Sequence, residues 1–399
     1  MNKILVYSVF VFSFFLIVGN STENINIYAS SIICLIYITY RFLKMVQEKF
    51  IRINIERQEL TLLVLLISYV IFTLCLGIYY GIENLSIYKV LFNSLYICTF
   101  ILLVIDSKWT SEFTVTFARL FGYSFIFMGL VGIILYFLGI YAIKFTFTPP
   151  FFKVYDEDSM LSFFGEIRFQ SIFSHKTKYA FYCLMGMFIL RINSIMSKKV
   201  RVFGILVLSI NIILTNSVMS LIAMIIVWAT IIDYKKINIY FRYMFYCMVG
   251  LVVGLSGIFM YDYMSGVRDL STWGSRKIIW ENAIAFLKDH PVGVIDNWYF
   301  YRLDNHFQGA HNVFLNEFLD YGLLGGVLFL FVYISYFYSL FKIDKRTIGI
   351  MSAITLLFMV DNILYYDIVP IFWLFYVAVK IIVRNNKMLL YNGKTFKGD

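Results

Sequence analysis

The feature that most constrains this chain is a recurring apolar block of roughly 17–22 residues, the length a helix needs to cross about 30 Å of hydrocarbon at 1.5 Å per residue. Lipid offers no hydrogen-bond partners to the backbone, so only helices or a closed barrel can span it. A transmembrane barrel appears in a sequence as short segments in which apolar and polar residues alternate. This chain has continuous apolar runs instead. Hydrophobic residues make up 61% of the 399 residues and charged residues 15%, against about 45–50% and about 25% in soluble domains. The sequence therefore predicts an all-α polytopic membrane protein.

About twelve transmembrane helices are expected, in one membrane domain that covers residues 1–399. The first apolar block has no small-x-small cleavage site after it, so we expect a retained helix there rather than a signal peptide. The candidate spans are approximately 4–20, 26–43, 60–79, 90–105, 119–140, 177–193, 202–217, 218–233, 243–261, 312–340, 347–363 and 367–383.

The short loops divide by charge into two groups that alternate along the chain. Segments 41–57, 191–201, 235–242 and 342–346 and the C-terminal tail are basic, whereas connections 20–25 and 362–366 contain no Lys or Arg. The positive-inside rule then predicts that both termini are cytoplasmic. The basic residues of these loops also account for most of the net charge of +10. We therefore expect no nucleic-acid partner. The charged residues near cytoplasmic helix ends, Arg119, Asp233 and Lys380, are expected to reach water from there.

Two long connections, at 141–176 and 262–310, break the pattern of short loops and fall on the external side. All four histidines and three of the four prolines lie on these loops or at their edges, and loops of this length are uncommon without a function. In the second loop, Ser275 to His290 predicts a short amphipathic helix, capped by Ser275 and stopped by Pro291. We expect this helix to lie along the outer membrane–water interface. Its apolar face would carry Ile279, Ala283, Phe286 and Leu287.

Signatures of soluble enzymes are missing. The sequence has no Walker A loop and no GxGxxG, GxSxG or HExxH motif, and its histidines and cysteines do not have metal-ligand spacing. We therefore expect no cofactor and no metal site. Basic residues and histidines in front of a hydrophobic bundle suit a lipid with a phosphate or diphosphate head.

Two segments resemble a known family. Ser275-Arg276-x3-Trp280-x10-Pro291-x-Gly293, followed by His311-Asn312-x2-Leu315-x-Glu317-x4-Gly322-Leu323-Leu324-Gly325, resembles the signature region of the O-antigen ligase/polymerase superfamily. Upstream, Arg168-x2-Ser171-x-Phe173-x-His175-x-Thr177 is similar to the family's Arg-x2-Gly-x-Phe element. This chain departs from the family in having Ser171 where glycine is usual, and His-Lys-Thr where a Pro-Asn pair is common.

The resemblance implies a GT-C-like fold and a Wzy-like polysaccharide polymerase. Such an enzyme joins undecaprenyl-diphosphate-linked oligosaccharides at the outer face of the bacterial cytoplasmic membrane, by an inverting, metal-independent route, to make O-antigen or capsular polysaccharide. A further partner of such an enzyme is a chain-length regulator.

Chemistry then suggests roles for individual residues. His311 is the expected general base, or the residue that positions it, because histidine titrates near neutral pH. Arg168 and Arg276 are the expected diphosphate clamp, because guanidinium is a permanent, bidentate cation. The expected substrate contacts are Arg302, Asn312 and Glu317, with Asp320 and Asp361 as further candidates, whereas His175, His290 and His306 are expected to be uninvolved.

Other functions remain open from the sequence. An O-antigen ligase would use the same donor and transfer the glycan to lipid A-core. A lipid-linked oligosaccharide flippase or transporter would have a similar number of spans, although transporters usually place polar residues at mid-membrane on broken helices, often with repeated halves. A receptor or structural membrane protein would not need histidines and arginines gathered at one face.

Overall fold

The computed structural model describes residues 34–39, 42–43, 56–80, 86–105, 111–145, 152–160, 168–231, 276–295, 310–364 and 368–395. The spans predicted at 4–20 and 243–261, part of the span at 26–43, and Ser275, Arg302 and His306 lie outside these ranges.

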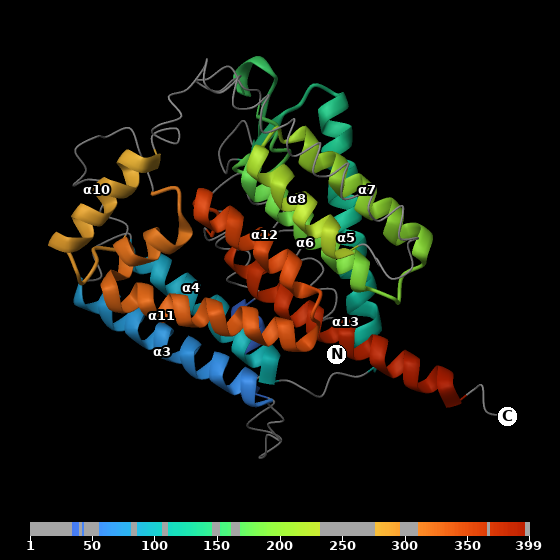
Figure 1. Ribbon diagram of the computed structural model, residues 1–399, viewed down its shortest axis with the longest axis horizontal. Coiled ribbons are helices and arrows are strands. Elements are labelled where there is room, and N and C mark those ends of the chain that lie inside the picture. Colours follow the sequence, from blue (N-terminus) through green and yellow to red (C-terminus); the bar gives the residue numbers. More distant parts are fainter. Residues whose placement is uncertain are drawn as a thin grey trace.

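The described chain is a helical bundle (Figure 1). Nine of the predicted spans correspond to helices whose bounds agree to within a few residues at most ends. Among the described residues, three helices are long and apolar enough to cross a membrane, over Arg57–Tyr79, Thr114–Phe137 and Val313–Ile343. The chain is thus a multi-pass helical membrane protein, while the total of twelve spans stays a prediction. The helices are α3 (Arg57–Tyr79), α4 (Ser86–Ile105), α5 (Ser111–Phe137), α6 (Lys176–Ile192), α7 (Lys198–Leu214), α8 (Val218–Ile231), α10 (Arg276–Asp289), α11 (Val313–Ile343), α12 (Thr347–Val360) and α13 (Val369–Thr395).

Helix α6 is the centre of the bundle, because it is buried on every face from Thr177 to Leu190. A buried polar network joins it to α5 and α7. The hydroxyl of Tyr179 donates to Asn211 Oδ1 at 2.7 Å, and Asn211 Nδ2 donates to the carbonyl of Gly129 at 2.8 Å. In an apolar bundle such bonds satisfy groups that would otherwise be costly to bury.

The loop at 141–176, predicted to be external, contains structure that the sequence did not predict. An antiparallel hairpin pairs β1 (Ala142–Phe145) with β2 (Phe152–Tyr155), and the 3₁₀ turn η2 (Asp158–Met160) follows. The chain then returns to the hairpin, because Ile143 N donates to Ser171 O at 3.0 Å and Arg168 N donates to Met160 O at 3.2 Å. This small sheet fixes the segment that leads into α6.

Helix α11 is two helical arms that meet at Gly322, and it is not the single crossing helix expected over 312–340. Gly322 has φ 69° and ψ −171°, a backbone conformation that glycine tolerates and other residues do not. We call residues 313–321 the fold-back arm and residues 323–343 the long arm.

Aromatic contacts show that the fold-back arm lies alongside the long arm. The ring of Phe314 packs 6.2 Å from Phe329 and 5.2 Å from Tyr333, and 6.1 Å from Phe358 of α12. Phe329 and Tyr333 lie roughly two and three helical turns past Gly322. The start of α11 therefore lies inside the bundle. Figure 1 shows the short arm turning back beside the long arm near α10.

The kink is held by direct backbone contact with the Pro291–Gly293 turn. Leu323 N donates to Pro291 O at 2.8 Å, and Ile295 N donates to Asp320 O at 2.9 Å. A Cβ on Gly322 would lie 2.3 Å from Pro291 O, and one on Gly293 would lie 2.3 Å from Gly322 N. Two glycines far apart in the sequence thus form a single close packing site.

Helix α10 confirms the amphipathic helix predicted over 275–290, but its apolar face contacts protein. Ile279 and Ala283 are buried against Ala310 and Leu319, with Phe286 and Leu287 packed beside them. The face that was expected to lie in the membrane interface therefore covers the fold-back arm. The side chains that α10 leaves exposed include Ile278 and Ile284.

A buried ion pair lies at the predicted cytoplasmic end of the bundle. Lys380 Nζ of α13 is 2.6 Å from Glu59 Oε1 of α3, and Tyr376 donates to the same oxygen at 3.3 Å. The Lys380 side chain is 25% exposed, so it reaches water in part, and it also bonds α13 to α3. Glu59 is only 2% exposed, so neutralising one member leaves a buried charge without its partner.

We predict that Gly322→Ala markedly lowers the thermal stability of the protein, because the new methyl group would collide with Pro291 O. Gly139→Ala is the matched control, since Gly139 has φ +72° but nothing within 4 Å of the place a Cβ would take. Thermal unfolding followed by size exclusion in detergent would measure both. Equal losses in the two variants would mean that φ strain, and not the contact with the turn, dominates.

We also predict that Glu59→Gln and Lys380→Gln each destabilise the protein by up to about 3–5 kcal/mol, the cost of breaking a buried pair from one side. The double variant should recover much of the loss, because no uncompensated charge remains. A double-mutant cycle on unfolding in detergent measures the coupling, and strictly additive losses would contradict the pairing.

Candidate functional site

The C-terminal end of α12 is where four separate segments of the chain meet. The last carbonyls of a helix have no partner within it and carry partial negative charge. Asn312 Nδ2 donates to Met359 O at 3.2 Å, and Arg276 Nε donates to Val360 O at 3.1 Å. The starts of α10 and α11 are thereby bonded to the end of α12.

Asp361, the next residue after α12, has a histidine at each carboxylate oxygen. His175 Nδ1 lies 3.3 Å from Oδ2, and His311 Nδ1 lies 3.6 Å from Oδ1. The side chains of His175 and His311 are 39% and 43% exposed, whereas that of Asp361 is 16% exposed. The carboxylate therefore lies beneath two accessible imidazoles.

Local backbone geometry places both histidines. His175 is the N-cap of α6 and accepts the Thr177 N–H at Nδ1 over 3.3 Å. His311 has a positive φ of 48° and precedes Asn312, which caps the fold-back arm by accepting from Leu315 N at 3.0 Å. Each histidine thus stands at the start of a helix that is packed into the bundle.

The electrostatics of this cluster keep Asp361 ionised. Burial alone would raise the pKa of Asp361, but His175 and side-chain hydrogen bonds from His311 and Thr177 outweigh it and lower the pKa below its usual range. A permanently charged carboxylate can orient an imidazole and stabilise it when it takes up a proton.

The pKa of His175 is lowered. Partial desolvation by the surrounding helices is the largest cause of the lower pKa. The charges of Lys178, Arg168 and Lys176 lower it further, and Asp361 opposes them. When Nδ1 is unprotonated it accepts from Thr177 N, and when it is protonated it can donate to Asp361. His175 is therefore held mainly as the neutral base near pH 7.

Arg168 lies beside His175, close enough for its charge to act on that imidazole. Its Nε is buried and has no hydrogen-bond partner within the described part of the chain. A buried guanidinium nitrogen without a partner is unusual. The segment that leads into α6 thus contributes a cation near the end of α12.

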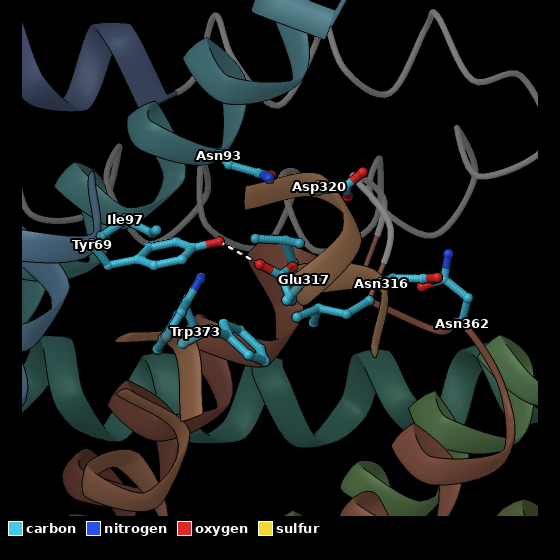
Figure 2. A pocket seen from close by; sticks show the side chains of 11 residues that line it. Tyr69, Asn93, Ile97, Asn316, Glu317, Asp320, Asn362 and Trp373 are labelled. Atoms are coloured by element: carbon cyan, nitrogen blue, oxygen red, sulfur yellow. Dashed lines mark hydrogen bonds between the residues drawn. The ribbon is translucent and has the colours of Figure 1, made fainter. Parts of the chain in front are cut away.

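A small polar cavity of about 40 Å³, open to solvent, adjoins this cluster through Asn362, the neighbour of Asp361. Figure 2 shows Tyr69 and Glu317 pointing toward each other, with Asn93 and Asp320 on one side and Trp373 on the other. The Tyr69 hydroxyl donates to Glu317 Oε2 at 2.6 Å. The cavity is lined by Tyr69, Asn93, Ile97, Asn316, Glu317, Asp320, Phe329, Asn362, Leu364, Val369 and Trp373.

The predicted site residues fall into three groups. His311 and Arg276 meet at the end of α12, and Arg168 reaches the same region through His175. Asn312 uses its amide to cap α11 and to bond α12, so it positions His311. Glu317 lies in the neighbouring cavity, and Arg302 lies outside the described residues.

Sequence reasoning did not single out His175 as a site residue, and it held Asp361 only as a further candidate. The two come from opposite ends of different helices, and no spacing along the chain links them. One signal was available: Asp361 is an acidic residue between two apolar blocks, which is uncommon without a partner.

The arrangement contains the groups needed to transfer a proton next to a negatively charged substrate. A neutral imidazole can accept a proton, the carboxylate can stabilise the imidazolium, and guanidinium groups can neutralise negative charge. Among the described residues, no group of three or more His, Cys, Asp or Glu side chains has the arrangement of a metal site.

Comparison with known proteins supports the sequence resemblance. Residues 203–330 match a family model described as O-antigen ligase. This region includes α10, the Pro291–Gly293 turn, His311 and the Gly322 kink, and the match supports the O-antigen ligase/polymerase superfamily. No curated protein matches the chain.

We predict that thermal stability falls as the pH is lowered from about 7 to about 5. A histidine whose pKa is lower in the folded state than in the unfolded state, about 6.5, binds fewer protons when folded, so acid favours unfolding. Asp361 stays ionised across this window and adds no slope. His175→Asn should flatten the dependence of thermal stability on pH between about 5 and 7. An unchanged slope in His175→Asn would refute the assignment.

Proposed function

We propose that this protein transfers glycan from a lipid-diphosphate carrier, acting as a polymerase that joins undecaprenyl-diphosphate-linked oligosaccharides into O-antigen or capsular polysaccharide. The observation that carries the proposal is the meeting of His311 and His175 on Asp361, with Arg276 and Arg168 at the same helix end. The superfamily match at residues 203–330 supports the same class of reaction.

His311 acts as the general base. Its Nδ1 faces Asp361, so Nε2 is the ring nitrogen left to accept a proton from the acceptor sugar's hydroxyl. The freed oxygen attacks the anomeric carbon of the donor as the bond from that carbon to the diphosphate oxygen breaks, with inversion. Asp361 stabilises the imidazolium that forms, and a positioned base of this kind contributes roughly 10²–10⁴ in rate.

Arg168 and Arg276 bind the diphosphate and neutralise the charge that grows on its leaving oxygen. Guanidinium suits this task because it is permanently charged and presents parallel donors. The charge of Arg168 acts on His175, which supports a place for Arg168 beside the proposed base. The activated sugar–phosphate bond supplies the driving force, so the proposed route needs neither nucleotide, cofactor nor metal.

The proposal includes a topology. The chain would cross the bacterial cytoplasmic membrane about twelve times in a GT-C-like arrangement with both termini cytoplasmic, and the loops at 141–176 and 262–310 would be external. Arg302 of the second loop, Asn312 and Glu317 would contribute to binding the oligosaccharide. A chain-length regulator is a further proposed partner.

A ligase is the second candidate, because the matching family model is described as O-antigen ligase. It would use the same residues and donor and transfer the glycan to lipid A-core. A flippase is less well supported, since the clustered His, Asp and Arg groups have no evident use in moving a lipid across the membrane.

Deletion of the gene in its own host distinguishes the three functions. Loss of a polymerase leaves single repeat units in place of long chains. Loss of a ligase leaves full polymer on the lipid carrier, and loss of a flippase traps repeat units on the cytoplasmic leaflet. Gel analysis of polymer length with extraction of the carrier lipid measures all three, and we expect the first.

In the complemented strain, we predict that His311→Ala and Asp361→Asn reduce polymerisation by about 10²–10⁴ and about 10-fold or more, respectively, since one removes the base and the other the charge that stabilises it. Arg276→Lys keeps the charge but loses the Nε donor to Val360, so a smaller loss is expected. His290→Ala is the matched control. Full-length polymer from His311→Ala at normal protein level would disprove the enzymatic assignment.

A further inference from the structure

His175 contacts the same carboxylate as His311, yet the proposed reaction gives it no step of its own. Its Nδ1 lies 3.3 Å from Asp361 Oδ2 and also 3.3 Å from the backbone nitrogen of Thr177. An unprotonated Nδ1 accepts from the Thr177 N–H, whereas a protonated Nδ1 donates to Asp361. One ring nitrogen therefore has two alternative partners, and the presence of a proton decides which of them it bonds.

The outer edge of the His175 ring is accessible to a ligand. The side chain is 39% exposed, although its Nδ1 is turned toward Asp361 and the first turn of α6. Because the two nitrogens lie on different edges of an imidazole, we assign the accessible part of the ring to the edge that carries Nε2. A protonated ring can therefore donate to Asp361 on one side and to an anion on the other.

Charged groups from three segments act on His175. Lys176 and Lys178 belong to its own helix, and Arg168 belongs to the segment before it. Asp361 follows α12. Partial desolvation is the largest cause of the lowered pKa of His175, the three cations add to it, and the carboxylate opposes it. An anion bound against this ring would act in the same sense as Asp361 and favour the protonated form.

Two further groups lie at the same helix end. His311 Nδ1 is 3.6 Å from the other carboxylate oxygen of Asp361, and Arg276 Nε donates to Val360 O at 3.1 Å. Since both histidines contact one carboxylate, a proton on His175 disfavours a proton on His311, and the two titrate as a coupled pair. Substitution of each histidine in turn separates their contributions.

The proposed ligand cannot bring a proton with it. A diphosphate that joins a sugar to a lipid is a diester at both ends, so it lacks the group with a pKa of about 6 that a phosphate monoester carries. An opposite charge within about 4–6 Å favours the protonated form of a histidine by a factor of about 10–1,000. A proton that appears on His175 when the diphosphate binds must therefore come from the solvent.

We propose that His175 binds the diphosphate group of the substrate and takes up a proton from the solvent as it does so, so that its imidazolium bridges Asp361 and the substrate. The inference rests on the proposed function for the identity of the ligand. It adds to Arg168 and Arg276 a third cation, one that forms only while the anion is bound.

The test is calorimetry on the full chain in phosphatidylcholine nanodiscs, with citronellyl methyl diphosphate as the probe. Heats of binding in buffers of different ionisation enthalpy give the number of protons taken up. We expect about 0.5–1 proton per bound diester at about pH 7, and an affinity that rises by up to about tenfold per pH unit as the pH falls from about 8 to about 6. Citronellyl methyl ether has the same tail without charge and should bind without proton uptake.

Two matched variants identify the histidine that takes up the proton. His175→Asn keeps a polar group near the position of Nδ1 but cannot be protonated, so proton uptake should fall to near zero and the affinity should become independent of pH. His311→Asn makes the same change on the other side of Asp361 and should keep most of the uptake. Uptake that disappears in His311→Asn and persists in His175→Asn would overturn the proposal.

The native protein decides the question even if His175→Asn does not fold. Neutral imidazole and imidazolium have different nitrogen chemical shifts, and the chain contains four histidines. NMR of histidine-labelled protein in the same nanodiscs should show one histidine changing from the neutral to the protonated form when the diester is added. No change in any histidine, or no proton uptake by the native protein, would refute the proposal.

Failure of this inference and failure of the proposed function have different signatures. If the diester binds without proton uptake while His311→Ala abolishes polymerisation in the host, the proposed function stands and the role of His175 falls. If the diester binds with uptake through His175 while His311→Ala still makes full-length polymer, the diphosphate site stands and the enzymatic assignment falls.

Discussion

The contact between the Pro291–Gly293 turn and Gly322 is the constraint on which the site depends. It reverses the chain at Gly322, so that the fold-back arm lies alongside the long arm of α11 inside the bundle. His311 and Asn312 begin that arm, and the depth of the arm brings them to the end of α12. A side chain on either glycine would force two backbones apart and would move the proposed base away from Asp361.

The end of α12 also gathers charged side chains. Arg276 donates to the carbonyl of Val360 at this end, and the charge of Arg168 acts on His175. Asp361 has a histidine at each carboxylate oxygen, and Glu317 and Asp320 line the neighbouring cavity. The cationic groups suit a substrate with an anionic diphosphate, as in the proposed function.

Much of the helical framework could be predicted from the sequence, because the length and hydropathy of each apolar block follow directly from the thickness of a bilayer. The positions of α3, α6 and α12 are examples. The hairpin at β1 and β2 was missed, since four-residue strands carry little periodic signal. The fold-back arm was missed because Val313 to Ile343 is apolar over most of its length. Hydropathy alone does not show that the chain reverses within such a segment. Motif order led to His311, Arg276 and Arg168, whereas the pairing of His175 with Asp361 is a tertiary contact that no local pattern encodes.

The exposure of the two histidines has a consequence for the competition between acceptors. Their side chains are 39% and 43% exposed, so water reaches both imidazoles. A transferase must favour a sugar hydroxyl over the far more abundant water, which would otherwise hydrolyse the donor. The bound substrate itself would therefore have to cover His175 and His311 and exclude the solvent that competes with the acceptor.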